Sequence, residues 1–188
     1  LVGGCGFIGH NLAIHLKKMG ADPIIVDSLA VNNILSFTDN DIKNKKLYSS
    51  ILNNRIELLN NNKIKLIIQD ARDYHAVSRV YQDINPDIII HLAAVSHANK
   101  SNKDPHSTFD HSFRTLENTL DYAKKSRTHT IYMSSSMVYG NFDSEDVKEE
   151  RICKPIGIYG TLKYSGELLV KAYSDVFDLP YTIIRPSA

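Results

Sequence analysis

Two side chains near the carboxyl-terminal end of the sequence have the types and spacing for acid–base chemistry. The segment Tyr-Gly-Thr-Leu-Lys at residues 159–163 places Tyr159 and Lys163 at positions i and i+4, on one face of a helix. A free tyrosine has a pKa of about 10 and is a poor base at neutral pH. A cation held beside the phenol stabilises the phenolate and lowers that pKa. Tyr159 and Lys163 are therefore candidate catalytic residues; the alternative is a surface tyrosine and a solvated lysine.

Three consecutive serines, residues 134–136, lie upstream at the end of a short apolar run. Ligands of open α/β sheets bind at the carboxyl edge of the strands. A serine run at that edge favours the catalytic interpretation of the tyrosine and the lysine.

A glycine cluster at the start of the chain could hold a phosphate group. Gly3, Gly6 and Gly9 have the spacing G-x-x-G-x-x-G, one residue different from the G-x-G-x-x-G pattern. Glycines permit a tight turn and let the backbone approach a pyrophosphate, and a helix start adds free N–H groups and partial positive charge. Together with Phe7 and Ile8, these glycines are predicted cofactor-binding residues; an ordinary glycine turn is the alternative.

An acid at the end of the next apolar run fits the same interpretation. Asp27 follows Gly9 by 18 residues, and about 20 are expected in dinucleotide-binding motifs. A carboxylate there accepts hydrogen bonds from both ribose hydroxyls and repels a 2′-phosphate, which favours NAD over NADP. No Arg or Lys follows within the next several residues to favour NADP, and the alternative is a turn-forming aspartate.

Alternating strand and helix patterns must position these residues. Apolar, mostly β-branched runs predict strands at residues 24–26, 64–68, 88–90, 130–133 and 181–184. Helical periodicity lies between them, at residues 7–19, 74–84, 107–125 and 159–177. Such alternation implies right-handed βαβ units. We predict an α/β fold, a doubly wound, mostly parallel Rossmann-type sheet with helices on both faces.

One polar segment, about residues 32–62, interrupts this alternation. It is rich in Asn and Lys and contains a predicted surface helix at about residues 51–59. The segment is either an exposed insertion between two strands or a flap near the adenosine or the substrate.

Composition limits the possible partners and the compartment. A chain of 188 residues fits one domain, and 43% hydrophobic with 23% charged residues is typical of a soluble globular protein. The net charge of +1 and the lack of a basic cluster favour neither nucleic acid nor a membrane surface. No run is long enough to span a membrane. The eight histidines and two cysteines show no metal-ligand spacing, and free thiols favour a reducing, cytoplasmic compartment.

The motifs occur in an order that resembles one family. The glycine motif with Phe-Ile, the strand-end Asp, HLAA at residues 91–94, SSSMVYG at residues 134–140 and the Y-x-x-x-K pattern follow one another. The sequence thereby resembles the extended short-chain dehydrogenase/reductases, the NAD-dependent epimerase/dehydratase group, over almost its whole length. The resemblance implies NAD as cofactor, a nucleotide-sugar substrate and a homodimer formed through residues 107–125 and 159–177. It also implies that residues 1–188 are a NAD-binding domain truncated at both ends, with the substrate domain largely absent.

The resemblance implies roles for individual residues. Tyr159 matches the catalytic base and Ser135 the residue whose hydroxyl hydrogen-bonds to the reacting sugar oxygen, while Lys163 would also hold nicotinamide-ribose hydroxyls. Many members have Asn where His111 stands, so a cofactor contact there is open. The predicted cofactor-binding residues matched in this way are Asp70 and Ala71 beside adenine, and Leu92, Ala93 and Ala94 along the cofactor.

The serine strand also bears on the reaction. Sugar 4,6-dehydratases of the family carry Asp and Glu where this chain has Ser136 and Met137, and a methionine cannot move protons. His97 and Ser101 do resemble the dehydratase loop, but elimination of water needs the missing acid/base pair. We therefore predict a nucleotide-sugar epimerase acting at C4 through a transient keto-sugar and bound NADH. The alternatives are a dehydratase, a keto-sugar reductase or dehydrogenase, and a non-catalytic NAD(H)-binding regulatory protein.

Overall fold

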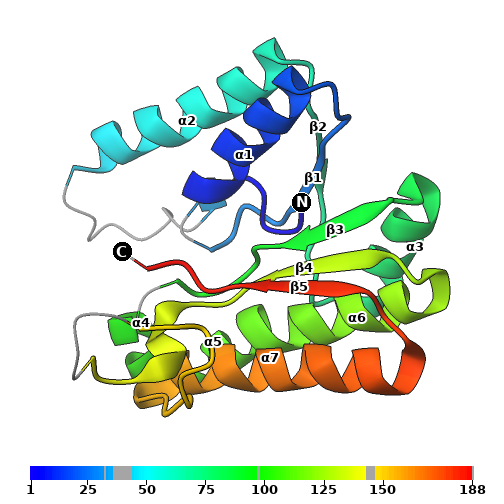
Figure 1. The fold of residues 1–188 in the computed structure, drawn as a ribbon. Helices are drawn as coiled ribbons and strands as arrows, with labels where there is room; N and C mark the ends of the chain where they lie inside the picture. The colour runs from blue at the N-terminus through cyan, green and yellow to red at the C-terminus, as the bar shows by residue number, and fades with distance from the viewer. Residues whose placement is uncertain (32, 36–43, 97, 143–146, 188) are drawn as a thin grey trace.

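A parallel sheet with helices on both faces forms the centre of the protein in a computed structural model (Figure 1). The structure describes residues 1–31, 33–35, 44–96, 98–142 and 147–187. Its elements in chain order are α1 (Phe7–Lys18), β1 (Ile24–Asp27), α2 (Lys45–Asn61), β2 (Lys65–Ile68), α3 (Tyr74–Ile84), β3 (Ile88–His91), α4 (Ala98–Lys103), α5 (Pro105–Phe109), the π-helical turn η2 (Asp110–Arg114), α6 (Thr115–Ser126), β4 (His129–Met133), the 3-10 helix η3 (Ser136–Tyr139), α7 (Gly157–Phe177) and β5 (Tyr181–Ile184).

Val2 joins the two halves of the sheet. β1 pairs with β2, and β3, β4 and β5 pair in that order, all in parallel. Val2 forms parallel bridges to Val26 of β1 and to His91 of β3, and its N–H donates to the carbonyl of Ile90 at 2.9 Å. Residues 1–2 thus occupy a central strand position, and the strand order is that of the Rossmann fold. The predicted parallel, doubly wound sheet is confirmed.

Two separate apolar cores lie on the two faces of the sheet. Helices α1 and α2 pack together over β1 and β2, whereas α3, α6 and α7 pack over the other face (Figure 1). The first core comprises Cys5, Ala13, Ile25, Leu29, Leu59 and Ile64. The second core includes Val77, Tyr81, Leu116, Leu120, Val170 and Leu179. Helices on both faces of one sheet are what the alternation of patterns predicted.

Local capping explains where several helices begin and end. Asp73 accepts the N–H of Ala76 at 2.9 Å at the start of α3, and Asn85 ends that helix with a φ of 47°. Asp104 accepts the N–H of Ser107 at 3.0 Å, and Pro105 occupies the first turn of α5. Carboxylate caps satisfy N–H groups that the helix leaves unpaired, and proline is tolerated there because its missing N–H is not needed.

The helix predicted at residues 107–125 differs from the structure. The segment begins at Pro105 and contains the π-helical turn η2 before α6 continues it. A π turn inserts one residue into the helical ladder, which periodicity alone does not detect. Helix α4 was not predicted, because its six residues are polar and too short to show a pattern.

The polar insertion is not simply an exposed loop. Its helix α2 runs for 17 residues, longer than predicted, and buries Leu52 and Leu59, of which Leu59 belongs to the first core. Part of the insertion, residues 32 and 36–43, lies outside the described residues. The predicted surface helix is therefore also a packing element of the first core.

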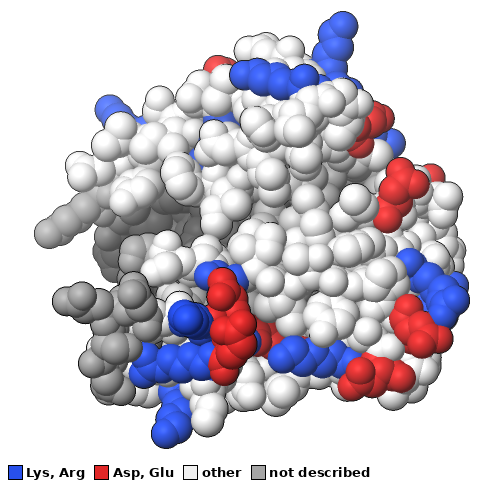
Figure 2. Space-filling view, in the orientation of Figure 1, with Lys and Arg blue, Asp and Glu red and all other residues white. Residues whose placement is uncertain are grey.

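Charged side chains do not gather by sign on the face shown in Figure 2, where basic and acidic residues are interspersed. Of the helices in the described part of the chain, none has the length and apolar character needed to cross a membrane.

Candidate active site

The glycine loop between Val2 and α1 is shaped for close backbone approach. Gly3 has a φ of +74°, and a Cβ there would lie 2.7 Å from the backbone of Ala93. A Cβ on Gly9 would lie 2.5 Å from the Cα of Gly4. A Cβ on Gly6, by contrast, would meet only the carbonyl of Gly3, at 3.5 Å. Two glycines are therefore required by packing, and the third keeps the loop open toward the cavity.

The first turn of α1 faces this opening. Gly6 is the N-cap and provides no side-chain hydrogen bond, and the first turn contains no acidic residue. The unpaired N–H groups and the positive end of the helix dipole are thus left for an anion. Phe7 and Ile8, 70% and 49% exposed, lie on the wall of the adjacent cavity.

One cavity of about 900 Å³ is lined by every residue predicted to bind the cofactor. A volume of that order is at the upper end of the usual range for ligand sites, which fits a dinucleotide. The predicted residues that line it are Gly3, Gly6, Phe7, Ile8, Gly9, Asp27, Asp70, Ala71, Leu92, Ala93, Ala94, Tyr159 and Lys163. Their individual roles stay predictions. Tyr159 and Lys163 share this cavity with the glycines, as the catalytic interpretation requires.

Asp27 connects the end of β1 to the glycine loop. One carboxylate oxygen accepts the N–H of Cys5 at 2.9 Å, and the other accepts the N–H of Leu29 at 2.8 Å. Burial raises the pKa of Asp27, and these two backbone N–H groups partly offset that shift. Each carboxylate oxygen can accept more than one hydrogen bond. The predicted contact with ribose hydroxyls is therefore compatible with this geometry, although Asp27 also stabilises the loop itself.

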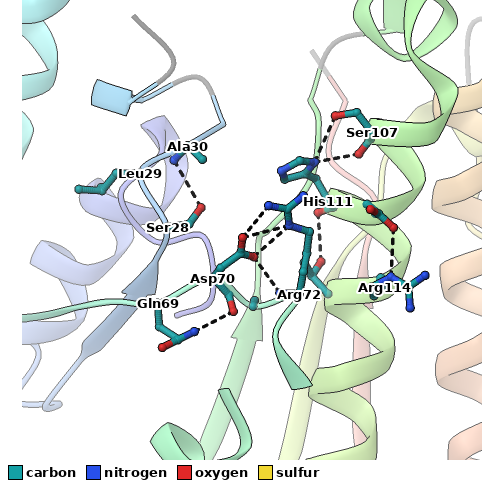
Figure 3. Close-up of polar contacts among 12 residues, drawn as sticks. Ser28, Leu29, Ala30, Gln69, Asp70, Arg72, Ser107, His111 and Arg114 are labelled. Atoms are coloured by element: carbon teal, nitrogen blue, oxygen red, sulfur yellow. Dashed lines mark hydrogen bonds and ion pairs between the residues drawn. The ribbon is translucent and has the colours of Figure 1, made fainter. Parts of the chain in front are cut away.

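The end of β2 is held rigidly at the cavity wall (Figure 3). The guanidinium of Arg72 donates to both carboxylate oxygens of Asp70, with Nη2 at 2.6 Å from Oδ2. Hydrogen bonding from Arg72 holds the pKa of Asp70 below its usual value. The buried Asn118 amide donates to the carbonyls of Ala71 and Arg72 at 2.8 and 3.0 Å. Asp70 and Ala71 thus have a fixed backbone beside the cavity.

His111 comes from the π-helical turn and also lines the cavity. Its Nδ1 lies 2.9 Å from the carbonyl oxygen of Ser107, so that nitrogen carries the proton in this contact (Figure 3). π turns are often found at functional sites. A cofactor contact through His111 stays a prediction.

His91, at the end of β3, is buried and uncharged. Burial lowers its pKa to about 3, and its Nδ1 lies 3.1 Å from the hydroxyl of Thr119. The three residues that follow it, Leu92, Ala93 and Ala94, line the cavity. We interpret His91 as a core residue that positions this segment.

The candidate catalytic residues converge between β4 and α7. The Nζ of Lys163 donates to the carbonyl of Met133 at 2.6 Å, and lies 6.0 Å from the ring centroid of Tyr159. The side chain of Tyr159 hydrogen-bonds to that of Ser135. Ser135 is 8% exposed and accepts the N–H of Met137 at 3.2 Å, which places it at the N-cap of η3. Ser135 is not one of the cavity-lining residues. It acts on the site by hydrogen bonding to Tyr159, which does line the cavity.

The pKa of Tyr159 differs from the expectation drawn from the Tyr–Lys spacing. Burial raises it, and the hydrogen bond to Ser135 offsets part of the rise. Burial also lowers the pKa of Lys163 to about 8, so its ammonium form still predominates at neutral pH. The lowering of the phenol pKa expected from Lys163 is thus not seen in the cofactor-free protein. The ammonium of Lys163 donates its hydrogen bond to the carbonyl of Met133. Desolvation therefore has the largest effect on the pKa of Tyr159.

A buried ion pair beside the serines was missed in the sequence. Glu167, fully buried on α7, accepts the hydroxyl of Ser134 at 2.5 Å and the Nε and Nη2 of Arg185 at 2.8 and 2.7 Å. Arg185 also donates to the hydroxyl of Tyr139 at 2.8 Å. Hydrogen bonding to Glu167 raises the pKa of Arg185 above its usual value. No local spacing in the sequence signals this pair, because Arg185 follows Glu167 by 18 residues.

Comparison with known proteins identifies the family. The model of the "NAD dependent epimerase/dehydratase family" matches residues 1–188. The chain belongs to this family. The membership confirms the resemblance inferred from the motifs, and with it NAD as the cofactor of the family.

The relatives of this chain differ from one another in the activities that their names give. The chain is 32% identical to protein CapI of Staphylococcus aureus over 187 residues, covering 98% of this chain and 52% of that protein. It is 26% identical to UDP-glucuronate 4-epimerase 6 of Arabidopsis thaliana, covering 98% and 38%. It is 27% identical to a dTDP-D-glucose 4,6-dehydratase of Dictyostelium discoideum, covering 98% and 42%. The chain thus spans about half the length, or less, of these relatives.

Solved structures agree on the architecture. UDP-glucose 4-epimerase from Thermotoga maritima, determined with UDP-glucose, has a TM-score of 0.79 at 26% identity, covering 98% of this chain and 53% of that one. The enzyme of that name from Brucella ovis, determined with NAD, has a TM-score of 0.80 at 24% identity, covering 98% and 50%. At this identity the second likeness establishes the fold alone.

Proposed function

We propose that this chain is the NAD-binding, proton-transferring part of a nucleotide-sugar 4-epimerase. The observation that carries the proposal is the arrangement of Tyr159, Lys163 and Ser135 beside the glycine-lined cavity, with no carboxylic acid at Ser136 or Met137. The family membership supports an enzyme of the epimerase/dehydratase type. The C4 position, the sugar and the nucleotide belong to the proposal, as does the activity of the whole protein.

The residues of the chain supply a route for one proton. Tyr159 takes the proton from a sugar hydroxyl. Ser135, whose hydroxyl proton is directed at the phenol in the cofactor-free structure, would turn that proton toward the same sugar oxygen when the substrate binds. Lys163 remains cationic at neutral pH, and in the NAD-bound protein its charge would oppose the desolvation that raises the pKa of Tyr159 in the cofactor-free structure. NAD, when bound, supplies the hydride acceptor and then the donor. The glycines, Asp27 and Asp70 would hold its phosphates and adenosine, because they surround a cavity of matching size.

The residues after Ser135 favour epimerisation over dehydration. Met137 is 38% exposed in η3, and its thioether has no ionisable proton. Ser101, which resembles the dehydratase loop, is buried in α4, and His97 lies outside the described residues. Elimination of water needs an acid and a base beyond Tyr159, whereas reversible oxidation at C4 needs only the one proton route.

Incubating the intact protein with UDP-, GDP-, dTDP- and CDP-sugars deuterated at C4 tests the proposal. We expect a C4 epimer that keeps its deuterium, formed without net NADH. Loss of water with a 6-deoxy keto product would instead identify a dehydratase, and stoichiometric reduction of added NAD a dehydrogenase. Binding of NAD without turnover would support the regulatory alternative. Tyr159→Phe is the matched variant, and wild-type activity in it would refute Tyr159 as the base.

A homodimer formed through α6 and α7 is part of the same proposal. The outer surface of α7 exposes Leu168 and Val176 at 49% and 70%. Light scattering of the intact protein would measure its mass, and a monomer at micromolar concentration would refute this assignment.

A further inference from the structure

Helix α2 presents one face to the cavity. Tyr48, Ile51, Leu52 and Arg55 follow the spacing i, i+3, i+4 and i+7, and all four line it. Leu52 is 3% exposed and anchors the helix, whereas Tyr48 and Ile51 are 49% and 41% exposed. The polar insertion therefore forms a wall of the cofactor cavity, which favours a segment near the adenosine or the substrate over a purely exposed insertion.

Arg55 places a positive charge next to the glycine loop. Its guanidinium carbon lies 6.0 Å from the ring centroid of Phe7, in the first turn of α1. The same charge acts electrostatically on the thiol of Cys5, inside the loop. The first turn of α1 is where unpaired N–H groups already favour an anion. Arg55 thus adds a full charge to a site that the backbone makes electropositive.

Within the described ranges no carboxylate forms an ion pair with Arg55, and its guanidinium lies over the ring of Phe7. The neighbouring arginines differ: Arg72 is paired with Asp70, and Arg114 with Asp110. An arginine that lines a cavity without a protein carboxylate is available to pair with an anionic ligand, and its planar group suits a phosphate.

We propose that Arg55 is a further cofactor-binding residue, which pairs with the diphosphate of the dinucleotide from the side of α2. The apolar part of the same face, Tyr48, Ile51 and Leu52, lines the same cavity. The inference rests on the proposed function only in requiring that the cavity holds a dinucleotide. The proposed epimerase activity and the proposed contact of Arg55 with the diphosphate can therefore be refuted separately.

Isothermal titration of the intact, nucleotide-free protein with ADP, adenosine and UDP tests the inference. We expect Arg55→Ala to weaken ADP by about 10-fold or more, the loss typical of a charge-assisted contact. Adenosine, which has no phosphate, should bind as to wild type, and Arg55→Lys should recover part of the ADP affinity. The matched control is Lys46→Ala, which removes an exposed charge of α2 away from the cavity and should leave all three ligands unaffected.

Three outcomes would overturn the inference. ADP binding of Arg55→Ala within twofold of wild type would exclude any contact with the diphosphate. An equal loss of ADP and adenosine affinity would mean that Arg55 stacks on the base and does not pair with phosphate. A loss confined to UDP would assign Arg55 to the substrate. Circular dichroism of each variant separates these results from unfolding, and Arg55→Lys keeps the test valid if Arg55→Ala does not fold.

Discussion

Replacing Glu167 tests whether a single buried carboxylate holds the serine loop in place. Glu167 bonds to Ser134 and, through two contacts, to Arg185, which also donates to Tyr139 of η3. One side chain therefore joins α7, the segment after β5 and the residue next to Ser135. Glu167→Gln keeps the shape of the side chain but removes its charge and one acceptor.

The structure sets the size of the effect. The side chains of Arg185 and Glu167 are 15% and 0% exposed, so the substitution leaves a nearly buried guanidinium without its counter-charge. Removing one partner of a buried ion pair costs about 3–5 kcal/mol. In a domain of this size about 1 kcal/mol shifts Tm by about 2–4 °C, so the loss should lower Tm by about 6–20 °C.

Calorimetric melting at pH 7 measures this loss in Glu167→Gln, Arg185→Met and the double variant. The two residues are coupled, so the double variant should lose clearly less than the sum of the single losses. Arg114→Ala is the control, because it breaks a pair in which Arg114 is 51% exposed and should cost about 1 kcal/mol or less. A Tm of Glu167→Gln within the range of that control would refute the reasoning.

Substitutions in the glycine loop and at His91 test other parts of the structure. Gly9→Ala should lower Tm and abolish NAD binding, because its Cβ would meet the Cα of Gly4 at 2.5 Å; calorimetry and titration would show this, and a normal Tm would contradict it. Gly6→Ala should keep Tm but weaken NAD in the same titration, since its Cβ has space within the protein and enters the cradle instead; unchanged affinity would be evidence against this placement. The pKa of His91 is lowered to about 3 in the folded protein, so the unfolded chain binds the extra proton between that value and about 6.5, and stability falls as pH drops through this window. By pH 5 the loss is about 2 kcal/mol in urea unfolding, and His91→Gln should lack it; equal losses in both proteins would contradict a buried neutral histidine.

Local patterns predicted most of the framework. The β-branched runs at residues 24–26 and 88–90 became β1 and β3, and helices 74–84 and 159–177 match α3 and α7 closely. The cofactor cavity followed from the same logic, because the glycine loop and the strand-end Asp27 meet at the carboxyl edge of a parallel sheet. The strands and helices could be predicted from the periodicity of apolar residues, and the parallel sheet from the alternation of the two patterns along the chain.

Contacts between distant segments were not predictable. Asn118 is 47 residues from Ala71, and no spacing relates Glu167 to Arg185 before the fold brings them together. The pKa of Tyr159 depends on burial, which the Tyr–Lys spacing does not specify. The sequence did not show which face of α2 lines the cavity, because two of the four residues on that face, Tyr48 and Arg55, carry polar groups and the segment is rich in Asn and Lys.

The two backbone contacts of Asp27 have a consequence for evolution of cofactor preference. A shift toward a 2′-phosphorylated cofactor is ordinarily achieved by neutralising this acid, yet here neutralisation also removes the acceptors of Cys5 and Leu29. Asn at this position would turn an amide NH₂ toward one of those two N–H donors. If Asp27 also selects the cofactor, a substitution that changes cofactor preference at this position would disturb the glycine loop as well, unless another acceptor replaced the carboxylate.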